Sequence, residues 1–334
     1  MKKLVFIACL LFASCSEAKE SDPTPIPPIT NPQPDPVGEV KYFGQLKVTE
    51  GKLTNSTGEE VMLRGVSLGW HNWWPRFYNT SAVKFLKNDW NANLVRAAMG
   101  VDPSGAYLDN PEFAIEKIKA VVESAIAENM YVIIDWHSHE LYPEEAKAFF
   151  IEMAKTYGDN PHVIYELFNE PDYETWEEVK TYSEDIIKEI RKHDPDNLIL
   201  VGSPTWSQDI HLVAQNPILN QENIMYVLHF YAATHKDYLR ERAEKAFNQG
   251  LPLFVTECAG MEATGDGPID AASWNAWLSW MENRKISWAS WSIADKDETC
   301  SMLLPEASSD GGWTDSQIKP WGKVVKKALE KNLR

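Results

Sequence analysis

The chain has 334 residues, of which 44% are apolar, and it carries a formal net charge of −17 at pH 7. This length is enough for one large domain or two small ones, and the apolar content is ordinary for a folded protein. An acidic surface of this kind repels nucleic acid and anionic lipid, so we expect neither as a partner.

The first fifteen residues, MKKLVFIACLLFASC, combine two lysines, a short apolar run and small residues before Cys15. The apolar run is too short for a membrane-spanning helix. We predict a lipoprotein-type signal peptide over residues 1–15, with Cys15 as the lipidated first residue of the mature chain. The protein would then be exported and anchored at the cell surface or outer membrane, touching the membrane only through this anchor. Plain secretion is the alternative.

Residues 16–38 include the stretch SDPTPIPPITNPQPDPVG. Proline at this density favours an extended, semi-rigid spacer over a packed core. We therefore predict a proline-rich linker over residues 16–38 and one folded domain over residues 39–334. A spacer behind a lipid anchor would hold this domain away from the membrane.

The domain opens with two alternating runs over residues 44–66, joined by a turn rich in Gly, Asn and Ser, which predict a β-hairpin leading into a first buried strand. Eight short apolar runs of strand type follow at residues 61–68, 92–99, 130–137, 162–171, 197–204, 224–231, 251–257 and 286–292. Stretches with apolar residues at helical spacing lie between them, as at 111–129 and 174–193. Eight such strand–helix units predict an α/β fold, a (β/α)8 TIM barrel.

Polar side chains stand at the ends of six of these runs, where a packed core has no use for them. The side chains are those of Arg96, Asp135, His137, Asn169, Glu170, His229, Tyr231, Glu257 and Trp291. A single histidine or arginine in a barrel is more often a paired core residue than a catalyst. Because the carboxyl ends of barrel strands meet at one mouth, the set as a whole predicts an active site there.

Two of these residues, Glu170 and Glu257, form a candidate carboxylate pair on the fourth and seventh strands. Glycoside hydrolysis uses one carboxylic acid to protonate the leaving oxygen and one carboxylate to attack the sugar. A separation of about 5–5.5 Å gives retention through a covalent intermediate, and about 6.5–9.5 Å gives inversion.

The ordered segments LRGVSLGW, NLVRAAM, VIIDWH, VIYELFNEP, GSPTWSQDI, LHFYAATH, FVTECA and WASWSIADKDE together resemble glycoside hydrolase family 5, in particular its bacterial endoglucanase branch. The resemblance runs from about residue 44 to about residue 325, and its most specific parts are Asn-Glu-Pro and Thr-Glu. It implies a retaining endo-β-1,4-glucanase that acts on β-glucan, with Glu170 as acid/base and Glu257 as nucleophile.

The resemblance also implies supporting roles around this pair. Arg96 and Tyr231 would hydrogen-bond Glu257 and keep it ionised, and His229 would lie beside Glu170. The residues that would contact sugars are Asn169 at the 2-hydroxyl, His137 beside it, Trp291 as the floor, Trp206 on the leaving-group side and Lys296 on the other side.

Other residues near the strand ends have less specific readings. We expect Asp135 to be structural and Glu166 to be a buried, paired carboxylate rather than a catalyst. Trp73, Trp74 and Trp136 are either subsite walls or core residues.

The sequence departs from the family pattern in two places. Gly100 stands where relatives often carry an aromatic residue, so one wall of the cleft is missing or comes from elsewhere. The segment SLGWHNWWPRFYN differs from the usual histidine-bearing loop, so His71 receives no role. Both changes concern glycan preference more than chemistry.

Several alternatives remain open at this point. The same chemistry could act on mixed-linkage glucan, xyloglucan or mannan, because the family hosts all of these. A non-catalytic glycan-binding lipoprotein and a metal-dependent hydrolase are the rivals from other classes. The histidines lack metal-ligand spacing, so we expect no bound metal. We also expect no cofactor, and we expect the protein to be a monomer. Cys258 and Cys300 either pair or remain free thiols.

Overall fold

The computed structural model describes residues 40–333 of the chain. The predicted signal peptide with Cys15 and the proline-rich linker lie outside the described residues. Within residues 40–333, none of the helices is both long and apolar enough to cross a bilayer.

The described chain begins with an antiparallel hairpin, β1 (Leu46–Thr49) and β2 (Lys52–Asn55). Its tight turn is Glu50–Gly51, where both residues have positive φ angles (51° and 76°), as a two-residue hairpin turn of right-handed twist requires. The Asn/Ser/Gly stretch forms a second turn, which brings Glu60 back to a bridge with Thr54. The predicted hairpin is therefore confirmed, with two turns where one was expected.

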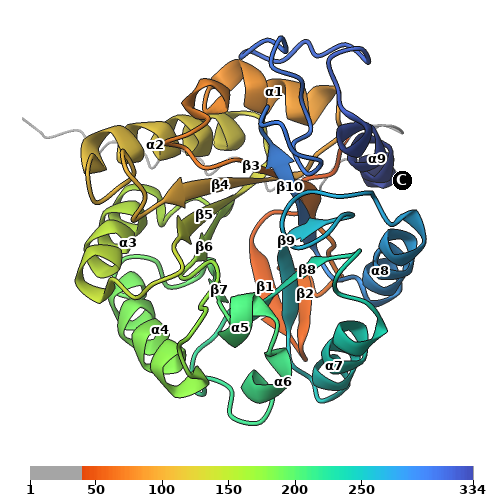
Figure 1. Ribbon diagram of the computed structural model, residues 1–334. Coiled ribbons are helices and arrows are strands. Elements are labelled where there is room, and N and C mark those ends of the chain that lie inside the picture. The colour runs from red at the N-terminus through yellow and green to blue at the C-terminus, as the bar shows by residue number, and fades with distance from the viewer. Residues whose placement is uncertain (1–39, 334) are drawn as a thin grey trace, which may run out of the picture. The chain divides into compact units, whose positions relative to one another are not determined.

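Eight parallel strands form a closed barrel in which the last strand pairs with the first (Figure 1). They are β3 (Arg64–Leu68), β4 (Leu94–Gly100), β5 (Tyr131–His137), β6 (Val163–Glu166), β7 (Leu198–Val201), β8 (Ile224–Tyr231), β9 (Leu253–Ala259) and β10 (Trp288–Ile293). This confirms the predicted (β/α)8 TIM barrel. The eight strands coincide with the eight runs expected from the sequence.

Helices surround the barrel in Figure 1. The α-helices are α1 (Thr80–Asn88), α2 (Pro111–Ala127), α3 (Pro143–Tyr157), α4 (Trp176–Ile190), α5 (Pro204–Ser207), α6 (Ile210–Val213), α7 (Asp237–Asn248), α8 (Ala271–Arg284) and α9 (Pro320–Leu329). Two short 3-10 turns, η1 (Pro75–Phe77) and η2 (Glu330–Leu333), complete the set. Helix α4 shows how the sequence sets a boundary, because Thr175 and Glu178 form a reciprocal capping box at its start.

One strand boundary differs from the prediction in a way that affects the site. The run 162–171 was expected to be one strand, but β6 ends at Glu166. Beyond it the backbone still bonds the neighbouring strand end, with Asn169 N donating to Trp136 O (3.2 Å) and Glu170 N donating to Ser138 O (3.3 Å). Asn169 and Glu170 therefore lie on an ordered extension of β6 rather than in its ladder.

The interior of the barrel changes from apolar to charged along the strands. Alternate residues of a strand face the same side, so Leu94 is followed by Arg96 and Ile164 by Glu166. The apolar end forms one buried cluster with Leu46 and Leu53 of the hairpin, which packs against this end. A second, larger cluster fills the space between strands and helices. The charged end of the barrel interior is where the site lies.

Candidate active site

Arg96 on β4 is fully buried and holds four polar side chains together. Its Nε donates to Glu166 Oε2 (2.7 Å) and its Nη1 to Glu257 Oε2 (3.0 Å). Its Nη2 donates to Asn169 Oδ1 (2.7 Å) and lies 2.9 Å from Asp135 Oδ2. Because the Asn169 oxygen is occupied by Arg96, the amide NH2 group of Asn169 remains available to a ligand.

Glu257, near the end of β9, has a partner on each oxygen. Tyr231 OH donates to Oε1 (2.7 Å), and Arg96 donates to Oε2. Both contacts agree with the sequence-based expectation. The net effect on ionisation differs from it, because burial and the nearby Glu170 carboxylate raise the pKa of Glu257, against the opposing influence of His229, Arg96 and Tyr231. The ionisation of Glu257 therefore depends on the charge of the neighbouring Glu170.

Glu170 lies between two histidines. Its Oε1 is 2.9 Å from His229 Nδ1, and its Oε2 is 3.7 Å from Nδ1 of His139. Oxygen atoms of Glu170 and Glu257 and a ring nitrogen of His229 all lie within 4.8 Å of one another. The structure therefore brings the two predicted catalytic carboxylates face to face at the barrel mouth.

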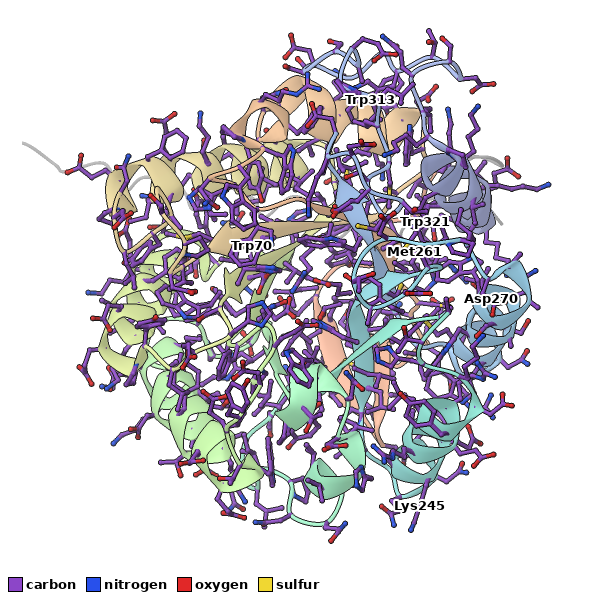
Figure 2. All side chains as sticks on the ribbon, viewed as in Figure 1. Trp70, Lys245, Met261, Asp270, Trp313 and Trp321 are labelled. Carbon is purple, nitrogen blue, oxygen red and sulfur yellow. The ribbon has the colours of Figure 1, made fainter. Side chains whose placement is uncertain are left out.

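His137 at the end of β5 is held in place on two sides. Its Nδ1 is 2.6 Å from Asp135 Oδ2, and its ring stacks on the Trp291 ring with centroids 5.2 Å apart and planes 6° apart. Burial and the charge of Arg96 lower the pKa of His137, which keeps its imidazole neutral. Trp321 of α9, labelled in Figure 2, donates from Nε1 to Trp291 O (2.7 Å). Asp135 thus orients His137, in line with the structural role expected for it.

The cleft has two lobes, which meet at Glu170, His139 and Tyr231. The first lobe has a volume of about 550 Å³ and contains Trp206 and His235. The second has a volume of about 190 Å³ and contains Glu257 together with Trp70, Trp73, Trp74, His137, Trp291 and Lys296. A chain lying across both lobes would pass directly over the paired carboxylates.

Trp206 stands in the first lobe with 42% of its surface exposed. Thr205, Trp206 and Ser207 all have positive φ angles (57°, 54° and 55°), so the segment labelled α5 is not helical there. Trp206 N donates to Pro171 O (2.8 Å), and Ser207 Oγ donates to Asn169 O (2.9 Å). This strained turn both presents the indole and braces the Asn169–Pro171 segment.

The wall that Gly100 does not provide is supplied by Trp70, which follows β3 and is labelled in Figure 2. A Cβ atom at Gly100 would meet the Trp70 ring at 2.7 Å. The same ring stacks on Trp73 (4.7 Å between centroids) and meets His137 edge-on (4.5 Å). Trp73 is 53% exposed, and Trp74 packs against Gly69, so both line the second lobe.

The structure also gives the surroundings of four further residues. Trp136 is fully buried and packs on Phe149, so it belongs to the core. Lys296 Nζ lies 2.5 Å from Glu298 Oε2 at the rim of the second lobe. Cys258 and Cys300 are both buried free thiols.

Sequence reasoning did not single out His139, His235, Thr256 or Trp70 as site residues. A signal existed for His139, since His137 and His139 share one face of an extended segment. His71, which received no role, is buried, and neither ring nitrogen has a hydrogen-bond partner within residues 40–333. The other omissions involve contacts between strands that a linear pattern does not reveal.

The sequence and fold have close counterparts among known proteins. The family model for cellulase (glycosyl hydrolase family 5) matches residues 54–297, which include both glutamates. The endoglucanase of Clostridium saccharobutylicum is 42% identical over 307 residues, covering 90% of this chain and 68% of that protein. Endoglucanase Z of Dickeya dadantii is 45% identical over 266 residues, covering 77% of this chain and 62% of that protein. The chain thus spans about two thirds of the length of these relatives.

Solved structures agree over nearly the whole domain. A structure from Cytophaga hutchinsonii has a TM-score of 0.85 at 45% identity and covers 87% of this chain and 96% of that one. The catalytic domain of Thermobifida fusca endoglucanase Cel5A, in complex with cellotetraose, has a TM-score of 0.82 at 32% identity, covering 86% and 98%. The chain therefore belongs to the cellulase family, glycosyl hydrolase family 5, as its motifs predicted.

Proposed function

We propose that this chain is a retaining endo-β-1,4-glucanase, which cleaves internal β-1,4-glucosidic bonds of cellulose-type glucans by double displacement. The approach of Glu170 and Glu257 carries the proposal, because one oxygen of Glu170 lies within 4.8 Å of one oxygen of Glu257 at the barrel mouth. An inverting site needs a gap of about 6.5–9.5 Å to admit a water molecule beside the sugar, and a retaining one about 5–5.5 Å. The short approach favours direct attack by a carboxylate.

In the first step, protonated Glu170 gives its proton to the glycosidic oxygen while Glu257 attacks the anomeric carbon. The carbon–oxygen bond to the leaving chain breaks, and a glycosyl ester forms on Glu257. In the second step, the Glu170 carboxylate takes a proton from water as the water oxygen attacks the same carbon. The ester bond breaks, Glu257 is again a carboxylate, and the product keeps the β configuration.

The surrounding residues support both steps. Arg96 and Tyr231 hold the two oxygens of Glu257 in place. The free amide group of Asn169 is available to the sugar 2-hydroxyl, a contact that strengthens in the transition state. Trp291 and the neutral His137 form one stacked surface beside the reacting sugar. Trp206 offers an exposed aromatic face on the leaving-group side.

A hydrolysis panel tests this function. Purified protein is incubated with soluble cellulose, mixed-linkage glucan, xyloglucan and mannan, and both polymer size and reducing ends are followed over time. Because sugars can occupy both lobes, we expect polymer size to fall before many reducing ends appear. Glu257→Gln should lose nearly all activity with an unchanged circular dichroism spectrum, and a variant that keeps most of its activity contradicts the proposal.

A second substrate remains a real candidate because of the wall formed by Trp70. The Trp70–Trp73 stack gives the second lobe a shape that differs from one with an aromatic residue at position 100. The chemistry is the same for mixed-linkage glucan, xyloglucan and mannan. The highest kcat/KM in the panel decides among them.

Two functions of other classes are separated by the same assay. A non-catalytic glycan-binding protein would retard glucans in affinity electrophoresis without releasing reducing ends. A metal-dependent hydrolase would lose activity in excess chelator, whereas the carboxylate mechanism keeps it. Glu170, His229 and Glu257 lie close enough to hold a cation, so the chelator arm is informative.

We further propose that the protein is an exported lipoprotein that meets β-glucan as a monomer. The basic start, apolar run and Cys15 of the sequence support this, with residues 16–38 as a spacer. Expressed in a bacterial host, the full chain should fractionate with membranes and incorporate labelled fatty acid, and Cys15→Ala should abolish both. Soluble, unlabelled wild-type protein would indicate plain secretion.

A further inference from the structure

A chain of hydrogen bonds links the two catalytic glutamates through His229, Thr256, Glu166 and Arg96. It starts at Glu170 Oε1, which is 2.9 Å from His229 Nδ1. His229 Nε2 is 2.8 Å from Thr256 Oγ1, and Thr256 Oγ1 donates to Glu166 Oε1 (2.6 Å). Arg96 then bridges Glu166 Oε2 and Glu257 Oε2. Thr256 and Glu166 are fully buried.

The direction of these bonds follows from the chemistry of Glu166. Burial acts to raise the pKa of Glu166, but the charge of Arg96 and the contacts with His229 and Arg96 outweigh it and lower this pKa. An ionised carboxylate only accepts hydrogen bonds, so the Thr256 hydroxyl must donate to it. The Thr256 oxygen is then left as an acceptor, and His229 Nε2 must carry a proton to donate to it.

This arrangement leaves Nδ1 as the ring atom of His229 whose protonation can change, and Nδ1 is the atom that faces Glu170. We propose that Thr256 is a positioning residue for the acid/base: its hydroxyl accepts a hydrogen bond from Nε2–H of His229 and so holds the ring with Nδ1 directed at Glu170. The inference deepens the proposed hydrolysis and rests on it. Thr256 acts through His229 and does not contact sugar.

The consequence concerns how readily Glu170 releases its proton. When His229 is an imidazolium, its Nδ1–H donates to the Glu170 carboxylate that forms as the leaving group is protonated. Burial acts to lower the pKa of His229, but its interactions with Glu166 and Glu170 raise this pKa to about 9. The imidazolium therefore persists across neutral pH and makes Glu170 a better acid. Thr256 stabilises the imidazolium because its hydroxyl oxygen accepts a hydrogen bond from the second ring N–H, that of Nε2.

Several other titratable groups around the His229 ring affect its protonation. The carboxylates that face His229 are those of Glu166, Glu170 and Glu257. Two further histidines interact with it, His137 on β5 and His235 after β8, and burial lowers the pKa of each. His229 therefore supplies the charge at Oε1 of Glu170, and Arg96 is committed to the other carboxylates. The other oxygen of Glu170, Oε2, faces Nδ1 of His139 at 3.7 Å.

The test removes the Thr256 hydroxyl and asks whether proton donation is the step affected. Thr256→Val should lower kcat/KM on glucan by about tenfold to 100-fold, the range of a partly impaired general acid. On a dinitrophenyl cellobioside, whose leaving group needs no proton, the loss should stay below about threefold. The basic limb of the glucan profile should move to higher pH, because Glu170 holds its proton more firmly beside a neutral His229.

Two variants control for structural damage. Thr256→Ser keeps the hydroxyl and should restore both the rate and the pH profile. Thr54→Val makes the same change at a buried threonine of the hairpin, remote from the mouth, and should leave the pH profile in place. Equal losses of Thr256→Val on both substrates, or an unchanged profile, would overturn the inference.

A measurement on the wild-type protein is independent of both activity and variant folding. Nitrogen-15 spectra of the histidine rings should show Nε2 of His229 protonated from about pH 6 to above pH 9, with only Nδ1 titrating. An unprotonated Nε2 in this range overturns the inference even if hydrolysis is confirmed. Absence of hydrolysis by the wild-type protein, with the ring state as described, refutes the proposed function instead.

Discussion

A single guanidinium, that of Arg96, organises the charged end of the barrel. It is buried with Asp135, Glu166 and Glu257, and its charge offsets part of the cost of removing these carboxyl groups from water. Its planar fork reaches several acceptors at once, which the point charge of lysine does not do. The site therefore depends on the shape of this side chain as well as on its charge.

Replacing Arg96 tests this dependence. Arg96→Lys should lower kcat/KM by at least about 100-fold and the free energy of unfolding by about 3–5 kcal/mol, because buried carboxylates lose their partners. Urea unfolding and the glucan assay measure the two effects. Arg242→Lys, at an exposed pair with Asp209, should change stability by less than about 1 kcal/mol. A stable, active Arg96→Lys protein would refute the role given to the guanidinium fork.

His71 provides a test of pH-dependent stability. Burial lowers its pKa from 6.5 to about 4, and its ring nitrogens lack hydrogen-bond partners within the described chain. Between pH 6.5 and 4 the unfolded state binds the proton and the folded state does not, so stability falls as the pH falls through this window. Above pH 6.5 the residue has no such effect.

His71→Leu removes that titration and should reduce the slope of unfolding free energy against pH by up to about 1.4 kcal/mol per pH unit, the value for one proton. Urea unfolding at several pH values from 4 to 8 measures the slope. His193→Leu, at an exposed turn residue after α4, serves as the matched substitution. Parallel wild-type and His71→Leu curves below pH 6.5 would contradict the account.

At the scale of single residues, the catalytic pair was predictable from the sequence. The pKa of Glu257 and the hydrogen-bond network around it were not. Glu170 and Glu257 are far apart in sequence, yet the rule that strand ends meet was enough to pair them. The upward shift of the Glu257 pKa was not predictable, because it depends on burial and on the distance to Glu170. Thr256 was overlooked beside Glu257, and a register shift between β8 and β9 lets both residues join the same network.

Among the structural elements, the loops that follow the strands decide the shape of the cleft. Trp70 after β3 fills the space above Gly100 at the end of β4. The turn over residues 205–207 ties the end of β7 to the extension of β6. These contacts join neighbouring loops directly, so the two lobes depend on pairs of loops rather than on single ones.

The pairing of Trp70 and Gly100 predicts a compensating double substitution. Gly100→Tyr alone should destabilise the protein by about 1–3 kcal/mol, since its Cβ would meet the Trp70 ring and Asn72 Oδ1, each at 2.7 Å. Trp70→Gly should relieve the part of this loss that comes from the indole ring, so the double-mutant cycle should give a coupling energy of about 1 kcal/mol. Thermal or urea unfolding of the four proteins measures it, and additive effects would contradict the contact.

Strand positions were predictable from apolar runs, whereas strand ends were less so. The run through Glu170 was expected to remain a strand, but β6 ends at Glu166 and the backbone turns to bond the end of β5. The pattern of apolar residues does not distinguish a strand that pairs within the sheet from an ordered segment that follows the strand and bonds the same neighbour. Likewise, the positive φ angles at Thr205 and Trp206 accompany a hydrogen bond from Trp206 N to Pro171 O, a contact that the local sequence does not encode.

For the whole molecule, the barrel interior changes from apolar to charged along its axis. Apolar side chains and the hairpin fill one end, and paired charges occupy the other. Family membership and the barrel were both predictable, since the motifs and the strand–helix alternation extend over nearly the entire domain. Export and lipid anchoring stay predictions, because residues 1–39 lie outside the described part of the chain.

The central claim is that Glu257 forms a covalent bond to the sugar while Glu170 moves the proton. Incubation with an activated 2-deoxy-2-fluoro-cellobioside, followed by mass spectrometry of the intact protein, tests it most directly. We predict a mass increase of one fluorocellobiosyl group, mapped to Glu257 after proteolysis and missing from Glu257→Gln. An unmodified wild-type protein that hydrolyses glucan, or a label on another residue, would contradict the account.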